Sequence, residues 1–564
     1  MNSSILYDKQ YNNDMTAYLK LWTTEKQNHE FLTPWWEEGK ETFKRIMIKH
    51  AVRIRRQTRK EEKKLINILQ NLEQQPTPDA ASIEKAKKDI SRLTETREKG
   101  AQIRSKAQWI EEGEKPTKYF FNLEKQTQPK NAINELEINN RTHKTNMEIL
   151  EGARDFYQQL YTAEQTDLDD QIWLTDQLTN QLDDISREQC EGPITTKETT
   201  KAVMRMHNNK TPGPDSLPKE FYIHFWSVLK DHMTDVFNKN FDFGTMTESQ
   251  QEAILRLLYK KEEKKLLKNW RPISLLNVDY KIAAPVIAER LRRVLPELIH
   301  EDQTCGIPNR SIYENIFRLR DMINHTKRNN TNMILVGLDQ EKAFDRVDRR
   351  FLKKILDRMN FGPSFKRWIE MLYAGAKCQI INNGWLSDPV RLERGLRQGC
   401  PLSPLLYVLV AETLGQAIRN ENRIQGITYP GANGETSKLV QYADDTTLTL
   451  KDDQSVLRCF DIINRFESGS RSKLNLTKTE GTFIGQKAGK TQGPVPITWK
   501  EDNITILGTS IGQNTTQNWN KTTEIWSNRN MVFKETHHQR ESSSSKNLRF
   551  SHHHLPSNNI QTTS

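Results

Sequence analysis

The spacing of apolar residues predicts a mixed architecture for the middle of the chain. Between residues 250 and 512, short apolar runs alternate with segments in which apolar residues recur every three or four positions. The runs are typical of buried strands and the segments of amphipathic helices. Their alternation predicts that residues 241–512 form an α+β domain.

The first 130 residues lack this alternation and are expected to form basic helices. From residue 34 to 72, Gly and Pro are scarce while Lys, Arg, Glu and Gln are abundant. Pro76 and Pro78 break the pattern, and a second helix is expected over residues 82–106. The basic positions form either a surface for nucleic acid or a solvated face laced with i,i+4 ion pairs, and the pattern alone favours neither. The densest cluster comprises Arg53, Arg55, Arg56, Arg59, Lys60, Lys63 and Lys64.

The segments on either side of the α+β domain differ from it in character. Residues 131–240 are expected to be a connector with helices, and their acidic stretch at 164–190 is expected to lie at the surface. Three prolines and a glycine at 210–218 predict a loop, and the pattern from Lys219 to Phe243 predicts a helix after it. Residues 531–564, with serine and histidine runs and few apolar residues, are expected to be disordered.

Composition narrows the class of partner. The chain has 564 residues, a formal net charge of +11 and a pI of about 9.1, which favours a polyanion, either nucleic acid or an acidic membrane. The most apolar run, residues 405–411, is too short to cross a bilayer, and the N-terminus lacks the apolar core of a secretory signal. The five cysteines are far apart and form no CxxC, so neither a zinc site nor a disulfide framework is indicated. A protein of the cytoplasm or nucleus, neither secreted nor membrane-bound, is expected.

Carboxylates at the ends of two predicted strands are the main candidates for chemistry. An apolar run at 333–338 ends on Asp339, and the alternating run from 438 to 450 turns at Asp444 and Asp445. An Asp-Asp pair in a turn is usually only a turn former, but the flanking strands here are apolar. The pair is therefore expected close to the core, where two like charges are costly without a cation.

The donor types indicate which cation would suit this pair. Oxygen ligands with no His or Cys nearby favour magnesium over zinc. If the two segments meet in space, they would hold two Mg²⁺ ions, with Mn²⁺ as the alternative ion, for phosphoryl transfer to nucleic acid.

The segment 394–404 offers a contact surface for a flat ligand. Two glycines and two prolines flank Gln398, so the backbone is free to approach a base pair, and a helix is expected to begin at Pro404 or Leu405. Taken alone, the segment is only a loop before a helix. Asp345 and Asp348, which are expected about one turn further on than Asp339, are expected to be surface or structural residues.

Taken together and in this order, these segments resemble reverse transcriptases of LINE-type, non-LTR retrotransposons. The resemblance runs from about residue 104 to 512 and rests on a series of motifs. These are a block upstream of the polymerase at 107–120, a loop at 212–218 with Ser216 in place of the usual Gly, a fingers motif at 269–276, motif A at 339–345, motif B at 397–404, motif C at 442–445, motif D at 474–480 and a primer grip at 506–508.

The resemblance implies a right-hand polymerase fold of fingers, palm and partial thumb, preceded by the basic helical extension. It implies an RNA-directed DNA polymerase that acts on an RNA template, a DNA primer or target, and deoxynucleoside triphosphates. A bulky Phe344 at the steric-gate position implies DNA rather than RNA synthesis. The other implied roles are metal binding by Asp339, Asp444 and Asp445, triphosphate contact by Arg271, nucleotide and template contact by Gln398 and Gly399, proton donation to pyrophosphate by Lys478 (a plain surface lysine is the alternative), and primer grip by Leu507 and Gly508.

The chain departs from the family pattern at both ends. Residues 1–100 are too few for the apurinic-type endonuclease that members commonly carry, and a thumb is expected to start at 513–530 without completing. We therefore expect an incomplete copy, with a frameshift or mis-predicted exon near residue 530. Two alternatives stay open. One is an impaired remnant that only binds RNA through its basic helices, and the other is an intron-encoded maturase-type reverse transcriptase, although the segments 107–120 and 212–218 favour the retrotransposon.

Overall fold

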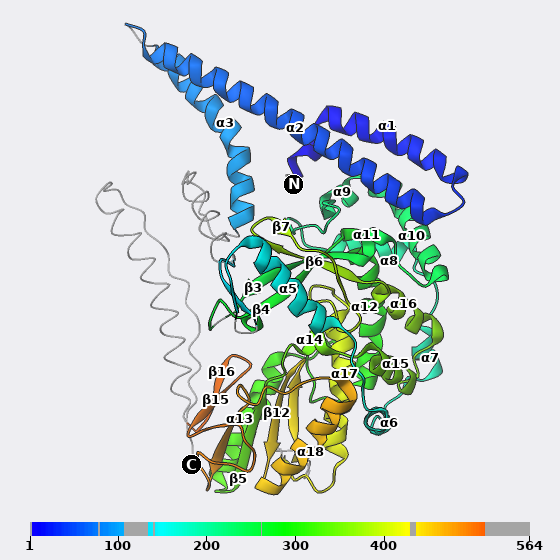
Figure 1. Ribbon diagram of the computed structural model, residues 1–564, viewed down its shortest axis with the longest axis vertical. Helices are drawn as coiled ribbons and strands as arrows, with labels where there is room; N and C mark the ends of the chain where they lie inside the picture. Colours follow the sequence, from blue (N-terminus) through cyan, green and yellow to red (C-terminus); the bar gives the residue numbers. More distant parts are fainter. Residues whose placement is uncertain are drawn as a thin grey trace, which may run out of the picture.

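A computed structural model of the chain describes residues 3–76, 79–105, 133–138, 141–260, 262–428 and 436–513 (Figure 1). The upstream block at 107–120, nearly all of the predicted thumb start and the predicted disordered tail lie outside these ranges, so the expectations for them stay predictions. Within the described ranges, no helix is both long enough and apolar enough to span a bilayer.

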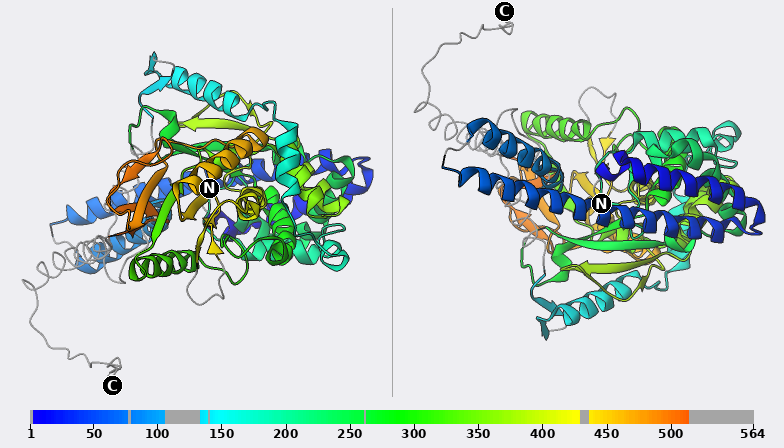
Figure 2. Two further views of the ribbon diagram at one scale, coloured as in Figure 1. Left: turned by 90° about the horizontal axis from the view of Figure 1, so that it is seen from below. Right: turned by 90° about the horizontal axis from the view of Figure 1, so that it is seen from above.

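Long helices form the N-terminal part, as predicted. They are α1 (Lys9–Glu25), α2 (Leu32–Glu73) and α3 (Ala80–Ser105), with 3₁₀ turns η1 (Ser3–Tyr7) and η2 (Lys26–Asn28). The first half of α2 is anchored, because its buried side chains run from Trp35 to His50, and Trp35 stacks on Trp22 of α1 at 3.9 Å between ring centroids. The second half of α2 leaves the body, and α3 returns beside it (Figures 1 and 2). We call the part of α2 beyond His50, together with α3, the helical arm.

A buried polar network fixes α2 to the rest of the molecule. The Lys40 ammonium lies 2.8 Å from the carboxylates of both Asp215, in the proline-rich loop, and Asp279. Trp36 and Gln250 also donate hydrogen bonds to Asp279. Burial by itself would lower the pKa of Lys40, but the two carboxylates raise the pKa above its ordinary value. The network therefore depends on a charged lysine that balances two buried carboxylates.

Replacement of Lys40 by Met is expected to destabilise the fold by about 3–5 kcal/mol, because it leaves the carboxylates of Asp215 and Asp279 buried without a counter-charge. Urea unfolding followed by circular dichroism measures the effect as a shift of the midpoint. Lys44→Met, four residues further along α2 and only half-buried, serves as the control and should change stability by less than about 0.5 kcal/mol. Equal midpoints for the two variants would contradict the anchoring role.

Short elements connect the N-terminal helices to the sheets. The acidic stretch at 164–190 was expected at the surface, but Leu174, Leu178, Leu182 and Cys190 in it are buried, so this prediction was wrong for its apolar residues. The elements are β1 (Leu136–Ile138), β2 (Arg141–His143), α5 (Asn146–Tyr161), α6 (Leu168–Asp176), α7 (Asp184–Glu188), α8 (Thr196–Arg205), α9 (Lys219–His224), α10 (Trp226–Phe243) and α11 (Glu248–Gln251).

Two details of this region refine the sequence predictions. The helix expected over residues 219–243 is two helices, because the chain departs from helical geometry at Phe225. In the predicted loop, Ser216 has a φ of 61°, which is the left-handed conformation that Gly adopts at no steric cost. This geometry explains why Gly is usual there in the family that the loop resembles.

The first sheet has strand order β4-β3-β6-β7, with β8 also paired to β6. The β3–β4 pair is a long antiparallel hairpin whose register places Leu258 opposite Arg271. The strands are β3 (Glu252–Tyr259), β4 (Trp270–Leu276), β6 (Lys377–Asn382), β7 (Trp385–Leu386) and β8 (Val390–Arg391), with the 3₁₀ turn η3 (Leu267–Asn269) before β4.

The second sheet has strand order β11-β12-β5-β13-β14 and is antiparallel except for the β13–β14 pair. The apolar run at 333–338 forms its central strand, so these residues are buried on both faces. The strands are β5 (Asn332–Leu338), β11 (Leu439–Tyr442), β12 (Asp445–Leu450), β13 (Glu480–Gly485) and β14 (Thr498–Lys500). Two small pairs, β9 (Ile427–Thr428) with β10 (Thr436–Ser437) and β15 (Asn503–Ile506) with β16 (Thr509–Gly512), lie outside it.

Helices cover both faces of the second sheet. On one face α13 and the β15–β16 hairpin share a small apolar core with alternate residues of β5, and on the other face α17 and α18 close the main core. The helices are α12 (Val278–Leu298), α13 (Ile312–Arg328), α14 (Ala343–Arg346), α15 (Arg349–Arg358), α16 (Pro363–Tyr373), α17 (Ser403–Asn420) and α18 (Asp453–Ser470).

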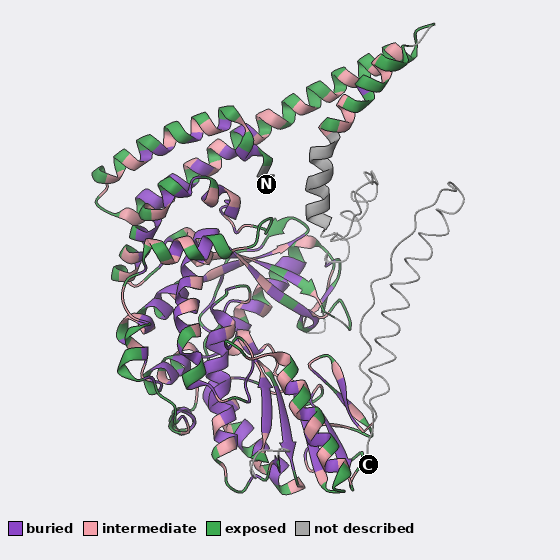
Figure 3. Cartoon of the chain, turned by 180° about the vertical axis from the view of Figure 1, so that it is seen from behind, coloured by how far each residue is buried: buried purple, intermediate pink, exposed green. Residues whose placement is uncertain are grey.

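One main core joins segments that were expected to be separate units. Its buried side chains extend from Ile5 to Val495, and Figure 3 shows this buried interior beside a largely exposed arm. The α+β class is confirmed, whereas the domain limits at 130, 240 and 512 stay predictions.

Candidate active site

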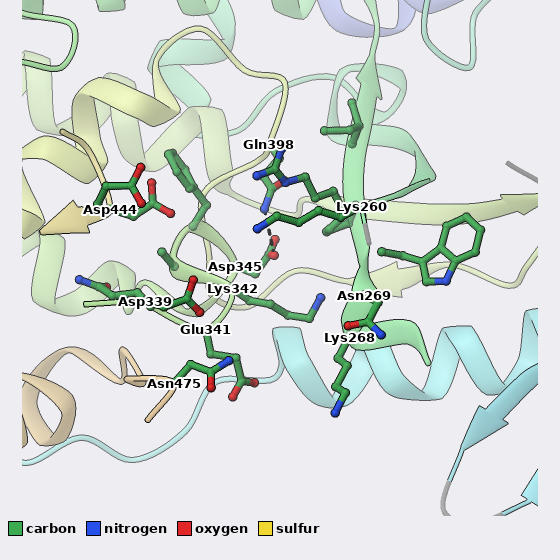
Figure 4. A pocket seen from close by; sticks show the side chains of 18 of the residues that line it. Lys260, Lys268, Asn269, Asp339, Glu341, Lys342, Asp345, Gln398, Asp444 and Asn475 are labelled. Carbon is green, nitrogen blue, oxygen red and sulfur yellow. Dashed lines mark hydrogen bonds between the residues drawn. The ribbon is translucent and has the colours of Figure 1, made fainter. Parts of the chain in front are cut away.

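The three predicted carboxylates meet at one end of the second sheet. Strands β11 and β12 form a tight hairpin in which Tyr442 pairs with Asp445, and Ala443 takes a positive φ of 53°. Strand β12 then runs beside β5 with Thr446 opposite Leu338, so the next antiparallel position sets Asp445 beside Asp339. The sequence condition that the two segments meet is therefore fulfilled, and Figure 4 shows Asp339 and Asp444 facing the same cleft.

The setting of these carboxylates differs from the expectation. They were expected close to the core, but Asp445 is exposed, and Asp339 and Asp444 are half-buried in the wall of a cleft of about 650 Å³. Partial desolvation, and then the charges of Asp444 and Asp339, raise the pKa of Asp445 to about 6. Desolvation also raises the pKa of Asp444. No ion pair joins the three to a Lys or Arg in the described part of the chain, so their negative charge is left without a direct partner.

The same cleft holds a ring that is fixed from behind. Phe344, in α14, is half-buried and stacks on Tyr407 of α17, with ring centroids 4.8 Å apart and planes 26° from parallel. Tyr407 is buried, and its hydroxyl donates a 2.6 Å hydrogen bond to Gln340. Phe344 lines the cleft, and its sugar-selecting role stays a prediction, whereas Tyr407 was missed because nothing in its own segment distinguishes it from a core tyrosine.

Asp345 is buried at the floor of the cleft, so the surface option for it was wrong. Gln398 Nε2 donates a 3.1 Å hydrogen bond to Asp345 Oδ2 (Figure 4), and Tyr161 donates a 2.9 Å bond to Oδ1. Burial raises the pKa of Asp345 to about 6, although Lys342 and Tyr161 act in the opposite direction. A carboxylate oxygen only accepts hydrogen bonds. Asp345 therefore holds the Gln398 amide with Nε2 toward itself, which leaves Oε1 facing the cleft. Asp348 is structural, as it caps α15 by accepting from the backbone of Phe351.

Gly399 brings its loop against the first sheet. It has a φ of 110°, and a Cβ there would lie 2.7 Å from the carbonyl oxygen of Ser274 in β4. Beside it, the carbonyl of Gln398 accepts a 2.8 Å hydrogen bond from Ser274 N. The predicted helix after this loop is α17, which begins at Ser403, one or two residues before the predicted start. The loop thus docks on β4 with Gln398 aimed into the cleft.

Five cationic side chains line the cleft opposite or beside the carboxylates. Arg271 was predicted, and Lys478 lies in the cleft wall but pairs with Glu262 of the β3–β4 loop at 3.2 Å. Lys260, Lys268 and Lys342 were missed. Lys260 could have been predicted from the β3–β4 hairpin, because it directly follows the strand that pairs with the Arg271 strand. Lys342 could not, because the burial that lowers its pKa depends on distant segments.

The β15–β16 hairpin closes the site from another side. Its turn residues Leu507 and Gly508 both have positive φ, 50° and 78°. A small cavity of about 90 Å³ between this hairpin and the second sheet is lined by Leu507 together with Asp339, Asp445 and Lys478. The predicted primer-grip segment therefore lies next to the carboxylates.

The described residues contain no set of three His, Cys, Asp or Glu side chains grouped closely enough to enclose a metal ion. The donor chemistry nevertheless fits a hard cation, because Asp339, Asp444 and Asp445 offer only oxygen ligands and carry unpaired like charge.

The match to a family model decides the identity of this region. Residues 259–511 match the model described as reverse transcriptase (RNA-dependent DNA polymerase). These residues belong to the reverse transcriptase family. All the predicted site residues from Arg271 to Gly508 fall within the reverse transcriptase segment, whereas Tyr161, the partner of Asp345, precedes it.

Relatives of the reverse transcriptase come from mobile elements. The Transposon TX1 uncharacterized 149 kDa protein of Xenopus laevis is 32% identical over 517 residues, which cover 90% of this chain and 39% of that protein. The Pol polyprotein from retrotransposable element R2DM of Drosophila melanogaster is 25% identical over 42% of this chain and 22% of its own length. The RNA-directed DNA polymerase from mobile element jockey of Drosophila funebris is 24% identical over 46% of this chain and 28% of its own. The chain thus spans less than half the length of these relatives, and its relation to non-LTR retrotransposon proteins is confirmed.

Proposed function

We propose that this reverse transcriptase extends a DNA primer on an RNA template as the polymerase of a non-LTR retrotransposon. The observation that carries the proposal is the strand register that sets Asp339 beside Asp445 in an open cleft with cations on its other wall. In this proposal the second sheet is the palm, the β3–β4 sheet belongs to the fingers, and the β15–β16 hairpin is the primer grip before a partial thumb.

The carboxylates would hold two Mg²⁺ ions, with Mn²⁺ as the alternative. Asp339, Asp444 and Asp445 fit this role because a divalent cation would neutralise their unpaired negative charge, and the raised pKa values of Asp444 and Asp445 reflect their desolvation and that unmet charge. When bound, the ions supply activation of the primer 3′-hydroxyl and neutralisation of the triphosphate. The protein itself contributes position and charge.

The remaining side chains would place the substrates. Arg271 on β4 and Lys260 directly after β3 would bind the phosphates of a deoxynucleoside triphosphate. Phe344 would exclude a ribose 2′-hydroxyl from the sugar position. Lys478 would give a proton to the leaving pyrophosphate, and for this it must first separate from Glu262.

Two loops would hold the nucleic-acid strands. Gln398 and Gly399 would contact the nucleotide and its template base, because their loop docks on β4 at the cleft. Leu507, which lines the small cavity with the carboxylates, and its neighbour Gly508 would contact the primer end. A primer-extension assay with a DNA primer on an RNA template, deoxynucleoside triphosphates and Mg²⁺ tests the proposal. Absence of extension with both Mg²⁺ and Mn²⁺ would reject it for this chain.

Asp345→Asn is expected to lower kcat/KM for the correct nucleotide about tenfold, because a hydrogen bond to a charged group is worth about 1.5–3 kcal/mol. Asn can donate to Gln398 and so turn the amide around, which presents a donor instead of Oε1 to the cleft. The RNA dissociation constant should not change.

A double-mutant cycle with Gln398→Ala separates this role from a general loss of packing. If Asp345 acts through Gln398, the double variant loses no more activity than Gln398→Ala alone. Additive losses would show that Asp345 does not position Gln398.

A further inference from the structure

The outer face of the helical arm concentrates positive charge. Successive residues of an α-helix are about 100° apart, so Thr58, Glu62, Leu65, Leu69 and Leu72 share one face of α2. All five are half-buried, and α2 packs against α3. The opposite, outer face carries five exposed cations within about 12 Å of helix. They are Arg56, Arg59, Lys60, Lys63 and Lys64, and we call them the arm cations.

Most acidic and basic residues of this helix lie on different faces, and Arg55, on the same flank as Glu62 and Glu73, is the exception. Between residues 53 and 76 the acidic residues are Glu61, Glu62 and Glu73, which lie on or beside the face toward α3. Glu73 pairs with Lys87 of α3 at 3.2 Å. None of the arm cations forms an ion pair with another described residue. A solvated helix laced with i,i+4 pairs would mix the two charges on one face, so the arrangement contradicts that interpretation.

The outer face continues with neutral hydrogen-bonding groups rather than with acids. Asn67, Gln70, Asn71 and Gln74 lie on it beyond the arm cations, and all four are exposed. Amide side chains bind phosphates and sugars as well as water. A membrane surface fits poorly, because the apolar face of this helix is already covered by α3 and cannot enter a bilayer.

We propose that the arm cations bind the phosphate backbone of the template RNA. This inference rests on the proposed function, which supplies a long nucleic-acid strand to the molecule. The primer ends in the cleft, whereas the template continues beyond it and can reach a surface outside. The arm stands on the side of the molecule that carries the β3–β4 sheet, and α3 returns toward that sheet (Figure 1).

The test compares two full-length variants with the same change in charge. One replaces all five arm cations by Gln. The control replaces five exposed lysines of the body by Gln as well. None of these lysines forms an ion pair with another described residue. These control positions are Lys9, Lys20, Lys197, Lys210 and Lys451.

Binding of a fluorescent 40-nucleotide RNA is measured by anisotropy at several KCl concentrations. Each phosphate that the protein no longer neutralises should reduce the slope of log Kd against log salt by about 0.7, hence by up to about 3.5 for the arm variant. At intermediate salt we expect at least about a tenfold loss of affinity, while the control slope changes by less than about one. Equal slopes for the two variants would overturn the proposal.

Two further outcomes are decisive. Duplex DNA added as a competitor should displace the RNA from the wild-type chain poorly, and a larger loss of DNA than of RNA affinity in the arm variant would assign the face to DNA.

Helicity from circular dichroism should be retained, because the replaced side chains are exposed. Binding does not need catalysis, so a chain that extends no primer but loses RNA affinity only in the arm variant would refute the proposed function and leave RNA binding by the arm cations standing.

Discussion

Asp444→Asn is expected to reduce primer extension by on the order of 10³-fold or more while RNA affinity stays within about twofold of the wild-type value. The substitution keeps the size of the side chain and removes one of three charges that face the cleft. The turn itself should survive, because Asn is also a good turn former and Ala443, not Asp444, is the non-glycine residue with positive φ there. Single-turnover extension on an RNA template and RNA anisotropy measure the two quantities.

Asp461→Asn on the exposed face of α18 provides the matched control. It removes the same charge from a helix that covers the second sheet, without touching the cleft, and its extension rate should equal that of the wild type. If Asp444→Asn extends primers as fast as this control, the carboxylates do not bind the catalytic cations. If it loses RNA binding as well, its effect is structural and the assignment fails.

Phe344→Ala is expected to lower the preference for deoxynucleotides over ribonucleotides on the order of 10–100-fold. The ring is held from behind by Tyr407 and cannot retreat, so its removal opens the space that a 2′-hydroxyl would need. The ratio of kcat/KM for dTTP and UTP on a poly(rA) template measures the effect. An unchanged ratio would remove the sugar-selecting role from Phe344.

Tyr407→Phe serves as the control for this prediction. It keeps the ring behind Phe344 and loses only the hydrogen bond to Gln340, so the sugar preference should change by less than about threefold. Tyr407→Ala should instead behave like a partial Phe344→Ala, because the ring of Phe344 then has room to move. Opposite behaviour of the two Tyr407 variants would mean that the hydroxyl, not the ring, sets the selectivity.

Local patterns predicted the parts of the site that lie on single segments. The run at 333–338, the turn at Asp444 and the loop around Gln398 each carry their own signal, and the order of the motifs tied them to one family. Burial was harder to predict, because an apolar flank says that a strand is buried but not that its end opens into a cleft. The exposed Asp445 shows this limit.

Contacts between distant segments could not be predicted. Asp345 is buried because Tyr161, which precedes it by 184 residues, covers it and donates a hydrogen bond. Likewise, the leucines of the 164–190 stretch are hidden by helices that follow much later in the chain. The sequence does not show which segments contact this stretch, so its acidic residues led to a surface prediction despite its few apolar positions. The break at Phe225 was missed because the apolar period continues through it.

The network around Lys40 limits how short a fragment of this protein can be and still fold stably. Its cation comes from α2, while Asp279 lies inside the segment that defines the reverse transcriptase family. A fragment that begins at residue 259 would keep that buried carboxylate and lose its counter-charge. The unit expected to fold stably is therefore larger than the segment by which the family is recognised, because α2 supplies a counter-charge that this segment lacks.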